Sequence, residues 1–132
     1  MISGISPALS GYNAAITRLD VSASNIANQF STQSIDQNGG TVNSPYVPQQ
    51  VVQSSDASGG VSTSTRPVSP ATVNQYAPSI PGANAQGIVQ MPNVDPTLQL
   101  VNANIASYDA GANLKLIKAQ DKMMQQALNI IS

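Results

Sequence analysis

Apolar residues near the start of the chain recur at alternating spacings of four and three residues. They fall at Ile5, Leu9, Tyr12, Ile16, Leu19, Ala23, Ile26 and Phe30. A mean spacing of 3.5 residues is typical of a helix whose apolar seam packs along a partner helix. Ser6-Pro7 provides a start signal, because a Ser hydroxyl can accept a free backbone N–H and Pro fits the first helical position. The pattern predicts a helix that begins at Ser6-Pro7 and ends near residues 29–32.

A second apolar pattern follows Asp95-Pro96, which is the same kind of start signal, and no further Pro occurs before the end of the chain. Its apolar positions are Leu98, Val101, Ile105, Tyr108, Ala112, Leu116, Ala119, Met123, Ala127 and Ile130. A helix of this length spans about 54 Å at 1.5 Å per residue. Helices that long are typical of coiled coils or repeating assemblies.

The middle of the chain has a different composition. Seven of the nine Pro and six of the nine Gly lie between residues 31 and 94, which rules out a long helix there. Short β-prone fragments occur at Tyr46–Gln53, Val61–Thr65, Thr72–Tyr76 and Gly87–Met91. The runs Asn38-Gly39-Gly40 and Ser58-Gly59-Gly60 are turn signals, so the fragments predict hairpins. The Ser- and Thr-rich stretch Ser54–Pro70 is expected to stay mobile in the free chain.

These patterns predict an α+β fold in three parts. Residues 1–32 and 95–132 form long terminal helices, and residues 33–94 form a small, hairpin-rich and partly irregular segment. Because the helices bracket the middle segment, the simplest arrangement packs them side by side as an antiparallel coiled coil.

Charge is scarce along the chain. Charged residues make up 8% and aromatic residues 4%, whereas an ordinary soluble domain carries about 25% charged residues. Outside its seam the first helix has mostly Asn, Ser, Thr and Ala, with Arg18 and Asp20 as its only charges. Such a surface favours close packing against further subunits, although a low charge content without functional meaning is the alternative.

Several kinds of chemistry are excluded by residue types that the chain lacks. It has no Cys and no His, and its six acidic residues are all Asp. This excludes thiolate and imidazole metal sites and the usual catalytic triads. Asp36 and Asp56 could pair as carboxylates, but loop aspartates are usually solvated. We therefore predict no catalytic, metal-binding or cofactor-binding residues, no small-molecule substrate and no enzymatic activity.

Partner classes are limited in the same way. The formal net charge is −1, with five basic residues, which argues against a nucleic-acid interface. Lys115, Lys118 and Lys122 form a basic patch, which is either a solvated face or a contact with an acidic neighbour. The N-terminus has neither the basic region nor the continuous apolar stretch of a cleaved signal peptide.

Two runs carry a resemblance to a known family. The first is Ser24-Asn25-Ile26-Ala27-Asn28, and the second is Met91-Pro92-Asn93-Val94-Asp95. In this order and at this length the chain resembles the rod proteins of the bacterial flagellar basal body, and most of all the short proximal-rod type. It departs from the family's usual pattern at Phe30, Leu98 and Ser107.

The resemblance implies a structural subunit that assembles helically with itself and with other rod subunits and transmits torque. It also implies contacts with the flagellar export apparatus and basal-body ring proteins, export without a cleaved signal peptide, and a place in the rod across the periplasm. Another axial or secretion-tube component (a hook, distal-rod or needle-like subunit) is the alternative. The positions predicted to form the assembly seam are Ile16, Leu19, Ile26, Leu98, Ile105, Leu116 and Met123.

Overall fold

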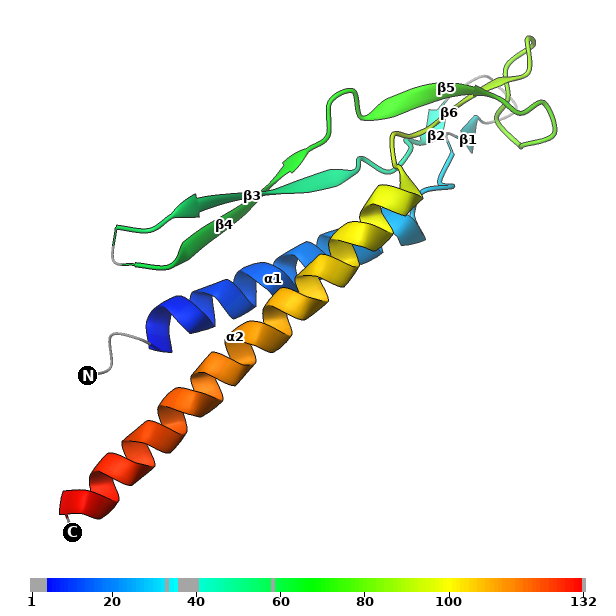
Figure 1. The fold of residues 1–132 in the computed structure, drawn as a ribbon. Helices are drawn as coiled ribbons and strands as arrows, with labels where there is room; N and C mark the ends of the chain where they lie inside the picture. Colours follow the sequence, from blue (N-terminus) through cyan, green and yellow to red (C-terminus); the bar gives the residue numbers. More distant parts are fainter. Residues whose placement is uncertain (1–4, 33, 36–40, 58, 132) are drawn as a thin grey trace.

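Two antiparallel helices form the body of the molecule (Figure 1). The computed structural model describes residues 5–32, 34–35, 41–57 and 59–131. Helix α1 spans Ile5–Ala27 and helix α2 spans Pro96–Ile131. The start of α2 is as predicted, because Asp95 Oδ1 accepts the N–H groups of Thr97 at 2.9 Å and Leu98 at 3.1 Å. The expected cap at Ser6 is wrong, since α1 already includes Ile5 and Ser6 lies in its first turn.

The segment between the helices forms three two-stranded antiparallel sheets. Their strand pairs are β1 (Ser34–Ile35) with β2 (Thr41–Asn43), β3 (Gln49–Ser55) with β4 (Val61–Pro67), and β5 (Thr72–Tyr76) with β6 (Ile88–Pro92). The α+β class and the four predicted fragments are therefore confirmed, with ends shifted by a few residues. Strand β4 lies within the Ser- and Thr-rich stretch Ser54–Pro70, and the mobility of this stretch in the free chain stays a prediction. The predicted turn at Asn38-Gly39-Gly40 lies outside the described residues, and strand β2 begins directly after it.

The hairpin β3–β4 lies along α1 and is attached to it at the hairpin tip. The N–H of Val61 donates to Ser10 Oγ at 3.1 Å. Gly60 has a φ of +117°, and a Cβ there would lie 2.4 Å from the same hydroxyl oxygen. Glycine is required at this position because both the left-handed backbone and the close approach exclude a side chain.

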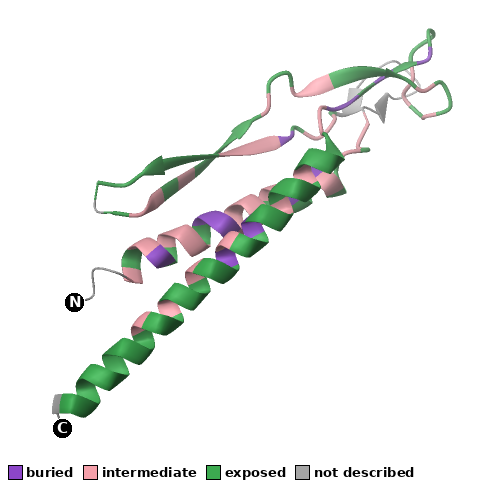
Figure 2. Ribbon diagram, in the orientation of Figure 1, coloured by how far each residue is buried: buried purple, intermediate pink, exposed green. Residues whose placement is uncertain are grey.

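Small side chains form the contact between the two helices. The buried residues of α1 are Ala8, Ala14, Ala15, Ser22 and Asn25, and those of α2 include Ala106 and Ala110 (Figure 2). Gly11 lets α2 approach closely, since a Cβ on it would lie 2.8 Å from Asn113 Oδ1. The predicted seam residues of α2 do not make this contact. They lie on an adjacent side of the helix, and Leu98, Ile105, Leu116 and Met123 are 54%, 47%, 58% and 58% exposed.

The helices differ in length, 23 residues for α1 against 36 for α2. The C-terminal part of α2 therefore extends past the start of α1 (Figure 1), and residues 121–130 are all exposed. Among the described residues, no helix is both long and apolar enough to cross a bilayer.

Candidate functional site

Asn25 joins three elements at one end of the helix pair. Its side chain is fully buried. Its Nδ2 donates to the Gln49 carbonyl oxygen at 2.8 Å, and its Oδ1 accepts the Gln49 N–H at 3.0 Å. The same amide also donates to Gln99 Oε1 at 3.3 Å and accepts the Tyr46 hydroxyl at 3.1 Å. One side chain of α1 thus holds the first residue of β3 and the first turns of α2.

The chemistry of this junction suits an amide. A backbone residue presents one donor and one acceptor, and a carboxamide offers the complementary acceptor and donor on two separate atoms of one neutral group. A hydrophobic residue would leave the buried N–H and C=O of Gln49 without partners, which is costly. Burial raises the pKa of the Tyr46 phenol by desolvation, which favours the protonated form that donates to Asn25.

Asn28 has a different role at the end of α1. Its Nδ2 donates to the Ser24 carbonyl oxygen at 2.8 Å, which also accepts the backbone N–H of Asn28 at 3.1 Å. The side chain therefore adds a second hydrogen bond to a carbonyl of the last turn. It does so without left-handed backbone, since the described residues other than glycine have no positive φ.

The second family run leads from the sheet into α2. Met91 and Pro92 are buried in β6. Asn93 follows and fixes the neighbouring loop, because its N–H donates to Ala71 O at 2.9 Å and its Nδ2 to Pro70 O at 3.0 Å. Asp95 then caps α2. The two runs, far apart in sequence, therefore meet at the same end of the helix pair.

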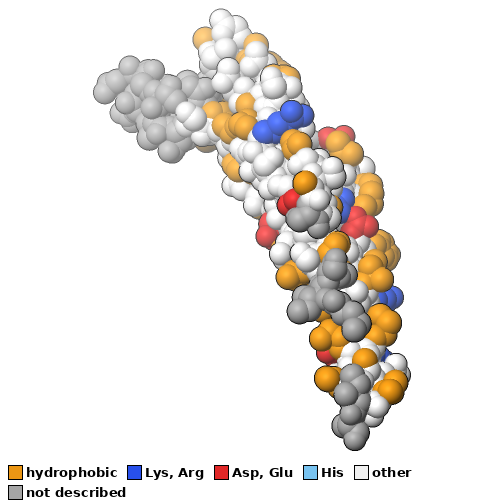
Figure 3. Space-filling model, turned by 90° about the vertical axis from the view of Figure 1, so that its left-hand side faces the viewer, with side chains coloured by type: hydrophobic (Ala, Val, Ile, Leu, Met, Phe, Trp, Pro, Cys, Tyr) orange, Lys and Arg blue, Asp and Glu red, His pale blue; other side chains and the backbone are white. Residues whose placement is uncertain are grey.

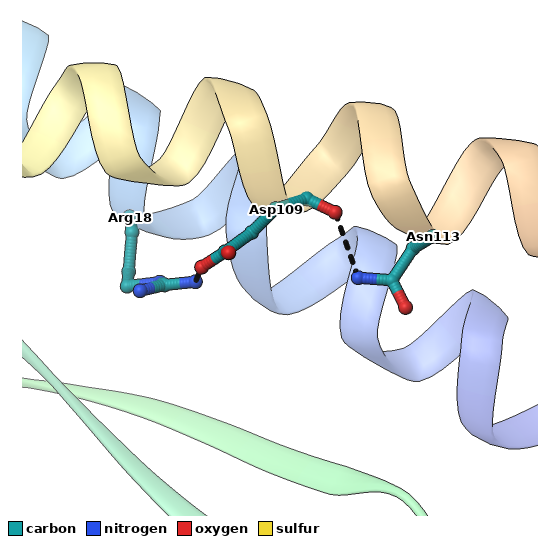
Figure 4. Close-up of polar contacts among 3 residues, drawn as sticks. All are labelled: Arg18, Asp109 and Asn113. Atoms are coloured by element: carbon teal, nitrogen blue, oxygen red, sulfur yellow. Dashed lines mark hydrogen bonds and ion pairs between the residues drawn. The ribbon is translucent and has the colours of Figure 1, made fainter.

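A polar cluster lies further along the helix pair, where α1 and α2 face the hairpin (Figure 4). Arg18 Nη2 forms an ion pair with Asp109 Oδ2. Asn113 Nδ2 donates to the Asp109 carbonyl oxygen at 2.9 Å. Because the two charged side chains are 28% and 46% exposed, water screens the pair and its contribution to stability is small.

The residues predicted for the assembly seam fall into two groups. Ile16, Leu19 and Ile26 are half-buried on α1. Those of α2 are more exposed and divide by position. Leu98 and Ile105 line a hollow between α2 and the hairpin, whereas Leu116 and Met123 lie where α2 passes the start of α1. Their role in contacts between chains stays a prediction.

Sequence reasoning missed the small-residue faces and the partners of Asn25. A signal for the first exists, since Ala8, Gly11, Ala15, Ser22 and Asn25 follow heptad-compatible spacings, as do Ala103, Ala106, Ala110 and Asn113. The large apolar residues one position away follow the same rhythm and were the stronger pattern. Gln49 and Gln99 carried no signal, because nothing local distinguishes them from other glutamines.

The described residues do not gather acidic groups into a metal site: no three carboxylates come together there. Asp36 lies outside the described part, so its proposed pairing with Asp56 has no geometry to report. Lys115, Lys118 and Lys122 are exposed on α2. Figure 3 shows few charged side chains, scattered among polar and apolar ones. This face of the molecule therefore carries little charge.

No family model matches the chain, but curated relatives do. It is 35% identical to the flagellar basal-body rod protein FlgC of Salmonella typhimurium over 119 residues, which covers 86% of this chain and 84% of the relative. FlgC of Escherichia coli O157:H7 is 34% identical over 127 residues, 92% of this chain and 90% of the relative. FlgC of Bacillus subtilis is 31% identical over 137 residues, which covers 92% of this chain and 91% of the relative. The chain belongs to the flagellar basal-body rod protein family.

Family membership confirms the resemblance drawn from the Ser24–Asn28 and Met91–Asp95 runs. In this rod protein the two runs have visible structural roles. Asn25 holds hairpin and helices together, and Asp95 starts α2. Asn28 bonds the last turn of α1, just before the β segment, and Asn93 bonds the loop at Pro70 from the end of the β segment.

Proposed function

We propose that the chain is a structural subunit of the proximal part of the flagellar rod, where it transmits torque and performs no chemical step. The family membership carries this proposal. The length supports the proximal position, since the alignments leave no room for a large inserted domain of the kind expected in hook and distal-rod subunits.

In this proposal the subunit assembles helically with itself and with other rod subunits and contacts the export apparatus and the ring proteins. It lies in the rod across the periplasm and is exported without a cleaved signal peptide. The terminal parts 1–32 and 95–132 build the tube, and the segment 33–94 lies against them.

The apolar seam supports assembly. Leu98, Ile105, Leu116 and Met123 are about half exposed in the single chain, and a stripe of large exposed apolar side chains marks a protein interaction site. In the rod these residues pack between helices of different chains as a coiled coil. A buried interface there would add stability that the single chain lacks.

Deletion of the gene in the bacterium that carries it tests the function. We expect loss of swimming in soft agar and basal bodies without a complete rod, both restored by the wild-type gene. Cells that swim normally after deletion would contradict the proposal.

A substitution pair tests the seam within the same strain. Leu116→Asp places a charge on the stripe, and Leu114→Asp makes the same change on the other side of α2, where Lys118 is one turn away. We expect Leu116→Asp to abolish swimming and Leu114→Asp to retain it. Both purified chains should keep wild-type helicity by circular dichroism, because both side chains are already exposed.

A further inference from the structure

A trough runs between the hairpin and α2, with α1 as its floor. It consists of two hollows. The first has a volume of about 530 Å³ and is lined by residues that include Val21, Val51, Leu98 and Ile105. The second has a volume of about 340 Å³ and lies nearer the hairpin tip, beside Val61 and Asn113. Arg18 lines both, so the two hollows are adjacent, and together they are called the trough here.

The trough is polar at its walls but carries little net charge inside. Arg18 is already paired with Asp109 (Figure 4), the Asp95 carboxylate at one end accepts backbone N–H groups of α2, and several of the other polar lining groups are neutral amides. The apolar side chains of Leu98 and Ile105 are about half exposed toward it. An occupant therefore needs an uncharged, mainly apolar face.

The projecting half of α2, residues 114–131, has such a face and no partner helix in its own chain over its last turns. Its stripe consists of Leu116, Ala119, Met123, Ala127 and Ile130, at spacings of three and four residues. Lys115 and Lys122, which are four and three residues from Ala119, lie along one edge of this stripe, and Lys118 lies farther from it. Figure 2 shows that nearly all of this half is exposed.

The trough and the projecting half match in length and in repeat. From Leu98 to Asn113 the trough follows α2 for about 23 Å, and Leu116 to Ile130 spans about 21 Å. Leu98 and Ile105 are separated by the same interval as Leu116 and Met123. The offset between the two pairs corresponds to about five helical turns, so all four side chains lie on one side of α2.

We propose that the projecting half of α2 from a second copy of this chain lies in the trough. The two α2 helices run parallel, with Leu116 of one copy against Leu98 of the other and Met123 against Ile105. The proposal rests on the proposed function and names the contact by which one subunit holds the next.

The contact is small for a single interface. Thirteen residues line the first hollow and nine the second, with Arg18 in both, but the projecting half is shorter than the about 20–30 residues that a stable interface has on each side. The contact therefore acts together with other contacts between rod subunits. Trough and projecting half are different surfaces of the same chain, so the contact is heterologous. Such a contact repeats into an open filament unless its rotation closes a ring.

The absence of Cys makes a direct cross-linking test possible. The double variant Ile105→Cys, Met123→Cys carries one thiol in the trough and one on the projecting half. Within one chain these positions are about 27 Å apart along the helix, too far for a disulfide, which needs Cα atoms within about 7 Å. After oxidation of the purified full chain and of swimming cells, we expect covalent oligomers of three and more chains on non-reducing gels.

Two controls define the result. Each single-Cys variant can form dimers at most, and Ile105→Cys, Lys122→Cys moves the second thiol to the lysine side of α2. We expect neither to form oligomers beyond a dimer. Equal oligomers from the Lys122 variant, dimers alone from the Met123 variant, or cross-linking of position 105 to a different protein would each overturn the proposed contact.

A swimming assay distinguishes failure of the proposed contact from failure of the proposed function. If the double variant swims under reducing conditions but forms no oligomers after oxidation, the docking contact is wrong and the rod function stands. If deletion of the gene leaves swimming intact, the rod function is wrong, whatever the gels show.

Discussion

At one end of α2, Gln99 lies against the buried amide of Asn25, and the contacts are polar, short-ranged and made within the chain. At the other end, residues 121–130 are exposed, and the large apolar side chains of Met123, Leu128 and Ile130 have more than half of their surface in contact with water. Folded proteins normally do the reverse, with large apolar side chains buried and polar groups outside. The difference supports the proposed division of roles, in which small and polar groups shape the single chain and large apolar groups are left for neighbouring chains.

The strongest test of this comparison removes the amide at the junction. Asn25→Leu leaves the buried N–H and C=O of Gln49 without partners, and we expect a loss of about 3 kcal/mol in the free energy of unfolding. Hydrogen exchange at the Gln49 amide should rise strongly, while amides in residues 121–130 should exchange as in the wild type. Unchanged protection of Gln49 would show that the junction does not depend on this side chain.

A second test addresses the small-residue contact between the helices. Gly11→Ala places a methyl group where Asn113 Oδ1 now lies 2.8 Å away, so the helices must separate or the amide must move, at a cost of about 1–2 kcal/mol. Gly111→Ala is the matched control, because a Cβ there meets nothing within 4 Å. The control should stabilise the chain by up to about 1 kcal/mol, since Ala is the better helix former. Ala gains the same helix propensity at position 11, so thermal unfolding should show Gly11→Ala to be less stable than Gly111→Ala by about 1–2 kcal/mol, and equal stabilities would contradict the close approach.

These positions also show what a sequence can and cannot predict here. Helix existence, the Asp95 cap and the main strands follow from local rules, namely spacing, Pro and Gly positions and side-chain acceptors. The face on which α2 meets α1 does not, because two heptad patterns run along that helix one position apart. Local reasoning favours the pattern with the larger side chains, and tertiary packing selects the smaller ones. The Asn25–Gln49 pairing is equally invisible, since it joins residues whose proximity depends on the whole fold.

A third test concerns the ion pair between Arg18 and Asp109, which lies between the two ends of the helix pair. It measures how much a charged contact contributes to stability there. Asp109→Asn keeps the shape and removes the charge, and we expect a loss below about 1 kcal/mol because the pair is partly exposed. Within the described residues, the Nε–H of Arg18 is buried without an acceptor, which further limits the benefit. The difference from the wild type in urea unfolding should shrink in 1 M salt. A salt-independent difference would point to the hydrogen-bond geometry instead.

The smallest expected effect is a pH dependence of stability at the Asn25 end of the helix pair, which should not extend to the exposed end of α2. Burial raises the pKa of Tyr46 above its ordinary value of about 10, so the folded chain holds this proton more tightly than the unfolded chain. The resulting stabilisation is complete below the unfolded pKa and is lost as pH rises through the folded pKa.

Tyr46→Phe removes the hydroxyl that donates to Asn25 Oδ1, at a cost of about 1 kcal/mol or less at neutral pH. Measured by thermal unfolding from pH 8 to 11, the gap between wild type and variant should narrow above pH 10. Hydrogen exchange of the amides in residues 121–130, adjusted for its intrinsic pH dependence, should be the same in both chains, since no part of that helix end contacts the phenol. A difference in thermal stability that widens with pH would mean that the ionised form of Tyr46, rather than the phenol, stabilises the junction.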